Sequence, residues 1–582
     1  MDIKEIRKEK KLTQAQSAEK LGISRRSYQT LESEGSKQEN KQKYNYYCSI
    51  LSQDETDKDK SKDNQENKTN ESFLTNVIYG EALSKLSKNV KRYNKRSCFK
   101  NLLEYINGDY SGRVCILYGL RRTGKTTMLF QLIEELDKRK TAYIKILEKN
   151  NMGELIQDIN KLTKMGIEYI LIDEVTLLED FINSASALSD IYCQMGQKIV
   201  LSGTDSLGFS FAKRDELYDR AITIHTSYIS YKEFSKVLNI SDIDTYIEYG
   251  GTLQKENMNF DDPDSKDDSV SFKEDESTRK YIDSAISRNI QRSLQNDSFG
   301  SRFYYLRELY DNHELTNAIN RLVENMNHEF LVSVVEETFK SHDLGSARQL
   351  LFKKQDDEVQ TALSQVNEKE VLSRLKALIE IKEKCDTKVK ITQDAIEQIK
   401  TYLYDLDLLK DIEVRYDDGK KEKVAVFTQP GMRYSIAKAL CYSLMDDDYF
   451  SGLTERAQTI IRDTILNDVK GRMLEEIALL ESTYRKTSDE LVFKYKRRNK
   501  PGEIDMVVYN SKDDTFKMYE IKHSKKVMPK MQCKYLNDKS IEEELSKKYG
   551  KQNGKYVLFC GITNGPEGDV YYEPINRFLT ER

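Results

Sequence analysis

Two groups of residues have the types and spacing that phosphate chemistry needs, and the first is a glycine-rich run at 119–126. It reads Gly-Leu-Arg-Arg-Thr-Gly-Lys-Thr and fits the pattern G-x-x-x-x-G-K-[ST] without a mismatch. Glycines let such a loop turn its N–H groups toward a polyphosphate, Lys125 would neutralise the β- and γ-phosphates, and the Thr126 hydroxyl would bind Mg²⁺. We therefore expect ATP and Mg²⁺ at a site made of Gly119, Arg122, Thr123, Gly124, Lys125, Thr126 and Thr127.

Two carboxylates at the end of an apolar run complete this chemistry. Residues 167–174 read Ile-Glu-Tyr-Ile-Leu-Ile-Asp-Glu, in which Asp173 would hold the metal through water and Glu174 would polarise the attacking water. Thr204 follows the next apolar run and would sense the γ-phosphate, as sensor residues do in AAA-type ATPases. The alternative for the two acids alone is a solvated strand end, and the glycine-rich loop upstream argues against it.

The second group, Asp505, Glu520 and Lys522, would suit metal-assisted cleavage of a phosphodiester. These residues stand in two alternating runs, 503–509 and 515–522, which a polar turn joins into a hairpin. Strand side chains alternate, so Glu520 and Lys522 share a face; the acids would hold Mg²⁺ and the lysine would help to position or deprotonate water. A helix expected at 470–481 offers Glu475 or Glu476 as a further metal ligand, and the register favours Glu475.

Two other interpretations of this second group stay open. An exposed charged hairpin would show the same residue types at the same spacing. In addition, a domain with an intact set of acids can serve as a binding platform without cutting, because fold and activity are separate properties.

Apolar strands alternate with helical segments around the glycine-rich loop. Four apolar runs suit buried parallel strands, and the segment after the loop carries apolar residues at helical spacing. This order predicts an α/β P-loop domain built on a doubly wound parallel sheet. The four strands are expected at 113–118, 142–147, 167–174 and 198–202.

The first 51 residues predict a separate all-α domain. Thr13 and Ser24 would cap the second and third of three short helices, which is the helix-turn-helix layout. The runs 12–14 (Leu-Thr-Gln) and 21–24 (Leu-Gly-Ile-Ser) resemble Xre/Cro-type DNA-binding domains. The stretch holds 11 basic and seven acidic residues, although the whole chain has a net charge of −4, so double-stranded DNA is the expected partner. The expected DNA contacts are Gln14, Arg25, Arg26, Gln29 and Thr30.

A three-helix module that binds protein rather than DNA is the alternative for this domain. Composition excludes other classes for the chain as a whole. No apolar run approaches the roughly 18 residues that cross a bilayer. The eight cysteines are scattered without a CxxC pair, which excludes a zinc ribbon or a disulfide scaffold. We therefore expect a cytoplasmic protein without membrane contact.

Further motifs extend a resemblance to a known family. The runs 201–206 (Leu-Ser-Gly-Thr-Asp-Ser), 230–234 (Ser-Tyr-Lys-Glu-Phe) and 248–251 (Glu-Tyr-Gly-Gly), taken with 119–127, resemble a prokaryotic AAA-type P-loop ATPase family. In that family the ATPase domain precedes a winged helix and a PD-(D/E)xK restriction-endonuclease-like domain. The resemblance implies that Arg220 reaches a phosphate in its own or a neighbouring subunit, although Asp219 stands where the family usually has Gly. AAA-type domains often form rings, so it also implies a homo-oligomer.

The chain is thus expected to be multidomain. The helical segment contains a helix, strand, turn and strand at 391–427 that fit either a winged helix or an ordinary α/β extension. The linker has no hydrophobic residue from 54 to 72, so it should be flexible. The expected segments are a helix-turn-helix domain (1–52), a linker (53–72), an AAA-type P-loop ATPase domain (73–251), an acidic surface loop (252–278), a helical or winged-helix middle (279–470) and an α/β endonuclease-like domain (471–582).

Three functions fit this organisation. The first is a DNA-binding, Mg²⁺-dependent ATPase coupled to a nuclease-like domain, acting on foreign or mobile DNA as the family resemblance implies. The second is an ATP-switched transcriptional regulator whose C-terminal domain binds without cleaving. The third is a signalling ATPase whose helix-turn-helix contacts only protein.

Overall fold

The structure is a computed structural model. It describes residues 3–9, 13–20, 28, 32, 73–178, 180–204, 208–209, 212, 216–253, 272, 275–287, 303–342, 361–362, 365–385 and 391–581. The chain divides into two compact units, Met1–Ser72 and Phe73–Arg582. Within the described residues, no helix has both the length and the apolar character needed to cross a membrane.

The first unit contains two described helices, α1 (Ile3–Glu9) and α2 (Gln14–Lys20). Thr13 caps α2 as predicted, because its hydroxyl accepts a hydrogen bond from the Gln16 backbone N–H at 3.2 Å. The Gln16 side chain in turn accepts from the Thr13 N–H at 2.9 Å, which completes a capping box. Ile3, Ala18 and Tyr28 are buried and form the described part of the core of this unit.

The second unit begins with a six-stranded sheet that confirms the predicted α/β architecture. Its strands are β1 (Asn76–Tyr79), β2 (Val114–Tyr118), β3 (Thr141–Lys145), β4 (Tyr169–Asp173), β5 (Lys198–Gly203) and β6 (Ala221–His225). Their spatial order is β1-β3-β4-β5-β2-β6, and all neighbours are parallel except β1, which is antiparallel to β3. The two edge strands, β1 and β6, were not predicted from the sequence.

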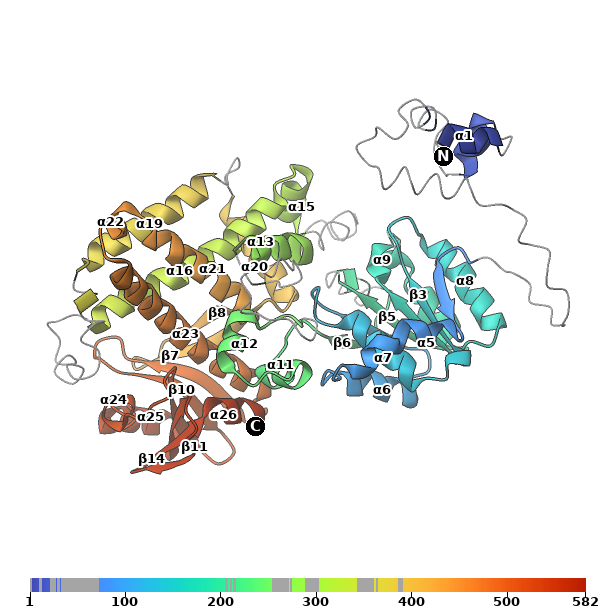
Figure 1. Cartoon of the computed structure of the whole chain (residues 1–582). Helices are drawn as coiled ribbons and strands as arrows, with labels where there is room; N and C mark the ends of the chain where they lie inside the picture. The colour runs from blue at the N-terminus through green and yellow to red at the C-terminus, as the bar shows by residue number, and fades with distance from the viewer. Residues whose placement is uncertain are drawn as a thin grey trace. The chain divides into compact units, whose positions relative to one another are not determined.

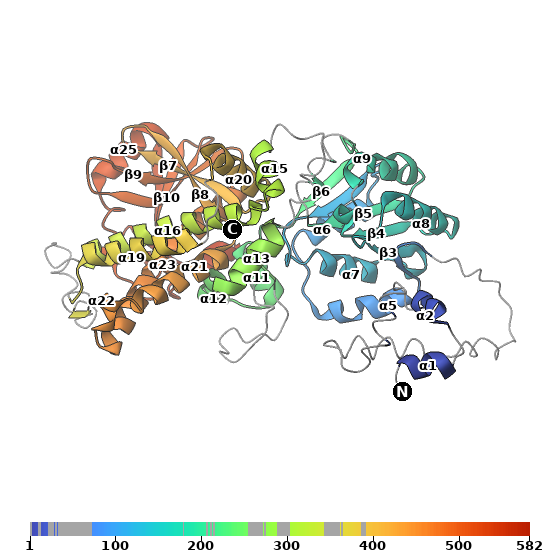
Figure 2. The ribbon, with the colours of Figure 1, turned by 90° about the horizontal axis from the view of Figure 1, so that it is seen from above.

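Helices cover both faces of this sheet (Figure 2). Cys115 and Leu117 of β2 pack with residues of α6 and α7, whereas Val114 and Ile116 pack on the other face with residues of α8. The fold thus places the loop after β2 at the carboxyl edge of a sheet that is buried on both faces. The helices here are α5 (Ala82–Ser87), α6 (Phe99–Asn107), α7 (Lys125–Glu135), α8 (Met152–Lys164) and α9 (Phe181–Ser184).

After β6 the chain continues through α11 and α12 into a group of helices (Figure 1). The longest described helix is α23, with 31 residues. The described helices of this part are α11 (Tyr231–Leu238), α12 (Ile243–Tyr249), α13 (Asp275–Ile282), α15 (Tyr304–Asp311), α16 (Leu315–His342), α19 (Glu368–Cys385), α20 (Gln393–Asp405), α21 (Pro430–Met445), α22 (Asp448–Ser451) and α23 (Glu455–Arg485).

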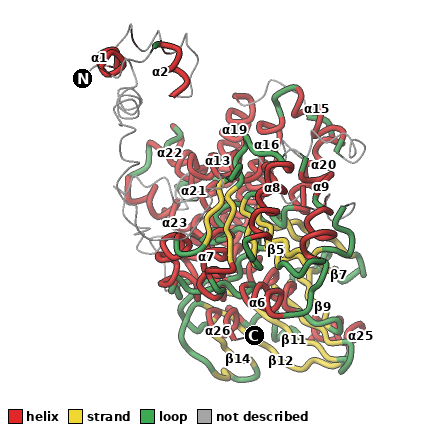
Figure 3. The backbone as a smooth tube through the Cα atoms, turned by 90° about the vertical axis from the view of Figure 1, so that its right-hand side faces the viewer, coloured by secondary structure: helices red, strands yellow, loops and turns green. Residues whose placement is uncertain are grey.

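A second, mixed sheet of eight strands follows, in the order β13-β14-β12-β11-β10-β9-β7-β8. Figure 3 shows the strands of both sheets in yellow. The strands are β7 (Leu409–Tyr416), β8 (Lys421–Phe427), β9 (Glu490–Lys496), β10 (Glu503–Asn510), β11 (Thr515–Lys522), β12 (Lys551–Phe559), β13 (Gly565–Glu567) and β14 (Val570–Pro574). The helices α24 (Pro529–Gln532), α25 (Lys539–Tyr549) and α26 (Ile575–Glu581) accompany it.

The limits of this sheet differ from the predicted domain boundary at 470/471. The hairpin β7–β8 forms as predicted, but β7 pairs with β9, so the hairpin extends the C-terminal sheet. The boundary itself falls inside α23. Alternating hairpins look alike in sequence whether they stand alone or join a sheet, which is why the boundary could not be placed.

Glu481 joins α23 to the start of α11. The Tyr231 backbone N–H, at the first residue of α11, donates to Glu481 Oε1 at 2.6 Å. Glu481 is buried, and this burial raises the pKa of its carboxyl to about 7 despite the nearby Arg485. The carboxyl therefore keeps its proton in the folded protein at pH values where the unfolded chain has lost it.

This raised pKa predicts a stability difference that depends on pH. Between about pH 4.5 and pH 7 the folded state binds the extra proton on Glu481, so the contribution of this carboxyl to the free energy of unfolding falls as the pH rises, by about 3 kcal/mol over this window. Glu481→Gln keeps an oxygen acceptor for the Tyr231 N–H but does not titrate. The difference in unfolding free energy between wild type and Glu481→Gln should therefore change with pH between 4.5 and 7, in chemical denaturation. A constant difference would contradict this assignment.

Candidate functional site

The glycine-rich loop runs from β2 into α7, as the sequence predicts. Gly119 adopts φ +146°, and a Cβ there would lie 2.5 Å from the Thr226 hydroxyl oxygen and 2.9 Å from the Ser227 nitrogen. Only glycine therefore fits between the loop and this neighbouring segment. Gly124 adopts φ +84° immediately before α7. A strand, loop and helix in this order place a bound phosphate at the helix N-terminus.

Lys125 is buried at the first residue of α7. Its Nζ donates to the carbonyl oxygens of Gly119 and Leu120, each at 2.8 Å. Burial lowers the pKa of Lys125 to about 8, which the carboxylates of Glu174 and Asp173 oppose only in part. A phosphate at the loop would supply a full counter-charge and would compete with the two carbonyl oxygens for this ammonium group.

The carboxylate of Asp173 accepts hydrogen bonds from four side chains. Thr126 Oγ1 lies 3.0 Å from Oδ2, and Tyr143 and Lys145 each donate to the same oxygen at 2.9 Å. Ser202 Oγ donates to Oδ1 at 2.7 Å. Burial opposes ionisation, but Lys145 and the hydroxyl donors hold the pKa of Asp173 below its ordinary value. Thr126 and Asp173 are oxygen ligands close enough to share one Mg²⁺, so the donor set fits the predicted metal.

Three of these donors, Tyr143, Lys145 and Ser202, were not predicted from the sequence. Tyr143 and Lys145 lie on β3, where Lys145 is the register partner of Asp173. Ser202 lies on β5, on the other side of β4. A lysine closing an apolar strand was a visible signal, but its neighbours depend on the order of strands in the sheet.

Glu174 and Thr204, for which the sequence predicts separate roles, lie close together. Thr204 Oγ1 lies 3.4 Å from Glu174 Oε2. Glu174 has φ +60°, a left-handed conformation that is costly for a residue with a side chain and is often found at functional sites. Arg122, in the loop, also has a positive φ of +62°, and Thr127 lies half-buried in the first turn of α7.

Arg220 lies at the wrong edge of the sheet to reach the loop of its own chain. Its carbonyl accepts from the Val114 N–H, at the start of β2, whereas the loop follows the end of β2. Five strand residues separate the two edges, or about 16 Å. The Arg220 guanidinium instead pairs with Asp190 at 3.1 Å. The expectation of a phosphate contact within one chain is therefore wrong, while a contact with a neighbouring subunit stays a prediction.

The second predicted site assembles on the hairpin of β10 and β11. Met506 pairs with Tyr519, and the Ile521 N–H, next to Glu520, donates to Asp505 Oδ2 at 2.8 Å. Lys522 Nζ lies 3.1 Å from Asp505 Oδ2 and 2.7 Å from Glu520 Oε2. Asp505 and Glu520 are buried. The structure thus brings the three predicted residues into one cluster.

Glu475 of α23 joins this cluster through a lysine that the sequence analysis missed. Lys494, on β9, is buried, and its Nζ lies 2.7 Å from Glu475 Oε2 and 3.7 Å from Asp505 Oδ1. The same ammonium group lies 3.6 Å from Glu503 Oε2. The run 491–495, Leu-Val-Phe-Lys-Tyr, shows one lysine among apolar residues, which was the available signal.

The alternative acid, Glu476, pairs with Arg433 and lies outside this group of contacts. The favoured residue Glu475 is thus the one beside Lys494. We call Glu475, Lys494, Glu503, Asp505, Glu520 and Lys522 the acidic cluster.

Burial and the neighbouring charges shift the pKa values of the carboxyl groups in the acidic cluster. Burial, with the neighbouring Asp505 carboxylate, raises the pKa of Glu520 to about 8. Burial also acts to raise the pKa of Asp505, but the ammonium groups of Lys522 and Lys494 lower it to about 2. Of these two neighbouring acids, Asp505 therefore loses its proton more readily than Glu520. Within the described part of the chain, buried Glu520 Oε1 has no hydrogen-bond partner.

A cavity of about 520 Å³ lies beside the acidic cluster, and Arg472, Glu475, Glu503, Lys522 and His523 contribute to its lining. The carboxylates are ligands of the kind that Mg²⁺ prefers. However, no three His, Cys, Asp or Glu side chains among the described residues are grouped so that they could hold a metal ion. Lysine ammonium groups lie between the acids, so a metal ion would have to replace at least one of them.

Only one of the predicted DNA contacts lies within the described residues. Gln14 Nε2 donates to Glu32 Oε2 at 2.7 Å, so this amide binds within its own domain. Glu32 also pairs with Arg7. The other predicted contacts, Arg25, Arg26, Gln29 and Thr30, lie outside the described residues.

Comparison with known proteins bears on two parts of the chain. Residues 111–235 match the model of the AAA domain. Residues 3–38 match the model of the helix-turn-helix. The chain is therefore multidomain, with an N-terminal helix-turn-helix and an AAA-type α/β nucleotide-binding domain. These matches cover neither α23 nor the second sheet.

A curated relative and two solved structures are similar to parts of this chain. An uncharacterized protein of Methanocaldococcus jannaschii is 25% identical over 134 residues, which is 22% of this chain and 30% of that protein. The chain thus spans less than a third of that relative. C. elegans PCH-2 is 17% identical over 29% of this chain and 48% of its own, with a TM-score of 0.17.

The Aeropyrum pernix ORC1 protein, solved in complex with DNA, is 14% identical over 64% of this chain and 94% of its own. Its TM-score is 0.21. With TM-scores this low, neither solved structure bears on the function of this chain.

Proposed function

We propose that this protein is a DNA-binding, Mg²⁺-dependent ATPase. The observation that carries the proposal is the contact between Thr126 and Asp173, which places the two expected metal ligands together beside Lys125. Lys125 would bind the β- and γ-phosphates, and bound Mg²⁺ would offset their charge. Glu174 would orient and deprotonate the attacking water, with Thr204 holding its carboxylate. The helix-turn-helix would bring the ATPase to double-stranded DNA.

We further propose that the acidic cluster is a nuclease-like site, which ATP binding controls. Glu475, Asp505 and Glu520 would hold Mg²⁺ once the ion displaced the Lys494 ammonium group, which now lies between Glu475 and Asp505. Lys522 would position water. Two observations support this. Among the described residues, the buried Oε1 of Glu520 has no hydrogen-bond partner, and the adjoining cavity, lined in part by Glu475 and Glu503, leaves room for a ligand. Foreign or mobile DNA would be the target.

A specific observation favours a second candidate, an ATP-switched regulator whose C-terminal domain binds without cutting. Lys494 and Lys522 already neutralise the acids with which they pair. A site balanced by its own ammonium groups can persist without metal. In this case the acidic cluster would stabilise the domain rather than hydrolyse a phosphodiester.

Asp505→Ala separates these two candidates. If the cluster cleaves DNA, labelled duplex and single-stranded DNA incubated with Mg²⁺ or Mn²⁺ and ATP should be cut by wild type, and cutting should fall at least about 100-fold in Asp505→Ala. Asp513→Ala, an exposed acid in the turn of the same hairpin, is the matched control and should cut normally. The nuclease would be rejected in favour of the regulator by three results together. Wild type would not cut DNA, it would still turn over ATP, and it would bind DNA in a gel mobility-shift assay in which Arg25→Ala does not.

A further inference from the structure

Arg96 lies in none of the motifs described above, yet it contacts the glycine-rich loop and α11 at once. Its side chain is only 4% exposed. The guanidinium group donates hydrogen bonds to four oxygen atoms, and these come from three separate segments of the chain. A planar guanidinium has fixed donor directions, so these four acceptors are held in one geometry.

On the loop side, Nη1 of Arg96 donates to the carbonyl oxygens of Thr123 at 2.7 Å and Thr226 at 2.8 Å. The hydroxyl groups of these two threonines also lie 2.8 Å apart. The Leu120 N–H donates to Ser227 Oγ at 3.1 Å. The loop is therefore bound at two places to residues 226–227, the segment that leaves β6.

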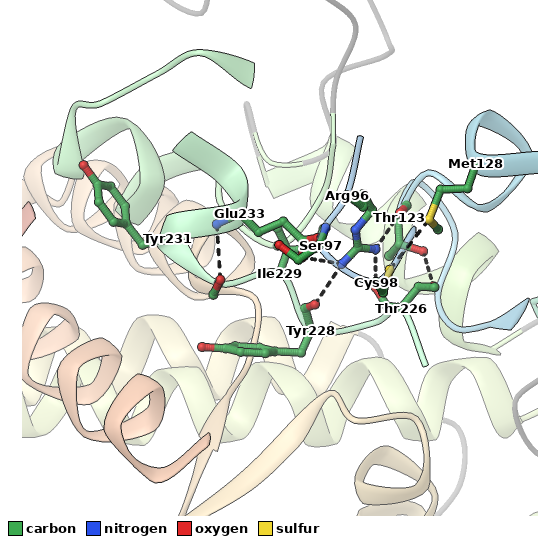
Figure 4. Close-up of polar contacts among 12 residues, drawn as sticks. Arg96, Ser97, Cys98, Thr123, Met128, Thr226, Tyr228, Ile229, Tyr231 and Glu233 are labelled. Carbon is green, nitrogen blue, oxygen red and sulfur yellow. Dashed lines mark hydrogen bonds and ion pairs between the residues drawn. The ribbon is translucent and has the colours of Figure 1, made fainter. Parts of the chain in front are cut away.

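On the other side, Nη2 of Arg96 donates to Tyr228 O at 3.1 Å and to Glu233 Oε2 at 2.7 Å (Figure 4). Glu233 lies in the first turn of α11, and its second oxygen accepts from the Ser97 N–H at 2.7 Å. Both oxygens of Glu233 are thus bound to consecutive residues of the Arg96 segment. This buried ion pair ties the start of α11 to the loop.

The segment held by Arg96 also contacts α23. The Tyr231 N–H donates to Glu481, and the ring of Tyr228 stacks on that of Tyr484 with centroids 4.0 Å apart. Glu475 of the acidic cluster lies six residues before Glu481 on the same helix, or about 9 Å along its axis. A continuous series of contacts therefore leads from the loop through Arg96 and α11 to the helix of the acidic cluster.

We propose that Arg96 is a positioning residue that passes a change in the glycine-rich loop on to α11 and α23. A phosphate would draw Lys125 away from the carbonyl oxygens of Gly119 and Leu120, and the loop backbone that carries these oxygens would then adjust. Thr123 lies in that backbone, and Arg96 connects its carbonyl oxygen to Glu233. The inference rests on the proposed nucleotide site and gives that site a connection to the C-terminal half.

Amide hydrogen exchange of the full-length protein, with and without saturating Mg²⁺ and ATP, tests this. In wild type, ATP should slow exchange about tenfold in residues 119–130 and also in residues 226–238 and 476–485. The double variant Arg96→Met/Glu233→Leu removes both charges, so no unpaired ion stays buried and the fold should persist. In this variant ATP should still protect residues 119–130, but protection of the other two segments should be lost. Arg96→Lys keeps the positive charge but lacks the planar guanidinium group with its several fixed donors. It should show the same loss of protection in residues 226–238 and 476–485.

Lys95→Ala is the matched control, because Lys95 is the exposed neighbour of Arg96 and pairs with Glu135. It should behave as wild type. The inference is overturned if ATP protects residues 226–238 equally in wild type and in the double variant. If ATP protects none of the three segments in wild type, the nucleotide site itself is rejected, so the two failures are distinguishable.

Discussion

Replacing Glu174 by Gln is expected to lower the ATP turnover rate about 100- to 10,000-fold while leaving ATP binding nearly unchanged. Gln keeps the shape of the side chain and an oxygen atom for the contact with Thr204, but it cannot take a proton from water. The phosphate contacts of Lys125 and the metal ligands Thr126 and Asp173 are untouched. The rate should be measured as phosphate release at saturating ATP and the affinity by calorimetry.

Lys125→Ala serves as the comparison for this variant. It removes the ammonium group from the loop, so both affinity and turnover should fall. Turnover at the wild-type rate in Glu174→Gln would show that another group activates the water. A loss of affinity equal to that of Lys125→Ala would show that Glu174 mainly shapes the site.

The second large effect is expected for stability, at Lys494. Lys494→Met leaves Glu475 and Asp505 without the ammonium group that lies between them, in a buried place. Removing one partner of a buried ion pair typically costs about 3–5 kcal/mol. Native-state hydrogen exchange in β9 and β10 should show a loss of this size in local unfolding free energy.

Lys496→Met is the control for this substitution, because Lys496 is on the same strand but is partly exposed. It should lose less than about 1 kcal/mol. In the double variant Lys494→Met/Glu475→Gln, part of the stability should return, because one of the unpaired charges is gone. A loss below about 1 kcal/mol in Lys494→Met alone would contradict the role of this lysine as the internal counter-ion of the cluster.

The geometry of the proposed nucleotide site could be predicted from sequence because most of it is local. The loop, the helix after it and the acids at the end of β4 each have a fixed spacing along the chain, and the structure places them accordingly. Lys145, Tyr143 and Ser202 could not be assigned, because their contact with Asp173 depends on which strands are neighbours. The contact of Arg220 with a phosphate in its own chain was wrongly predicted for a related reason, since sequence spacing does not tell at which edge of a sheet a residue lies.

The acidic cluster was predicted in part. Asp505, Glu520 and Lys522 sit on one hairpin, so strand alternation was enough to group them. Lys494 comes from β9 and Glu475 from α23, and only the packing of these elements brings them together. Arg96 gave no signal, because it stands among Lys91, Arg92 and Lys95, a run that is typical of a solvated surface. Burial of one residue in such a run is visible only in three dimensions.

The unbroken course of α23 limits how this protein can be divided into modules. The helix supplies core residues that pack with α21 and also with β9, β10 and β11. A fragment beginning at residue 471 would leave half of this helix behind and would lack part of its own core. Exchange of parts between related proteins during evolution is therefore restricted at this point. The junction between the two compact units lies after residue 72. At this point one N-terminal domain could be replaced by another without interrupting the second unit.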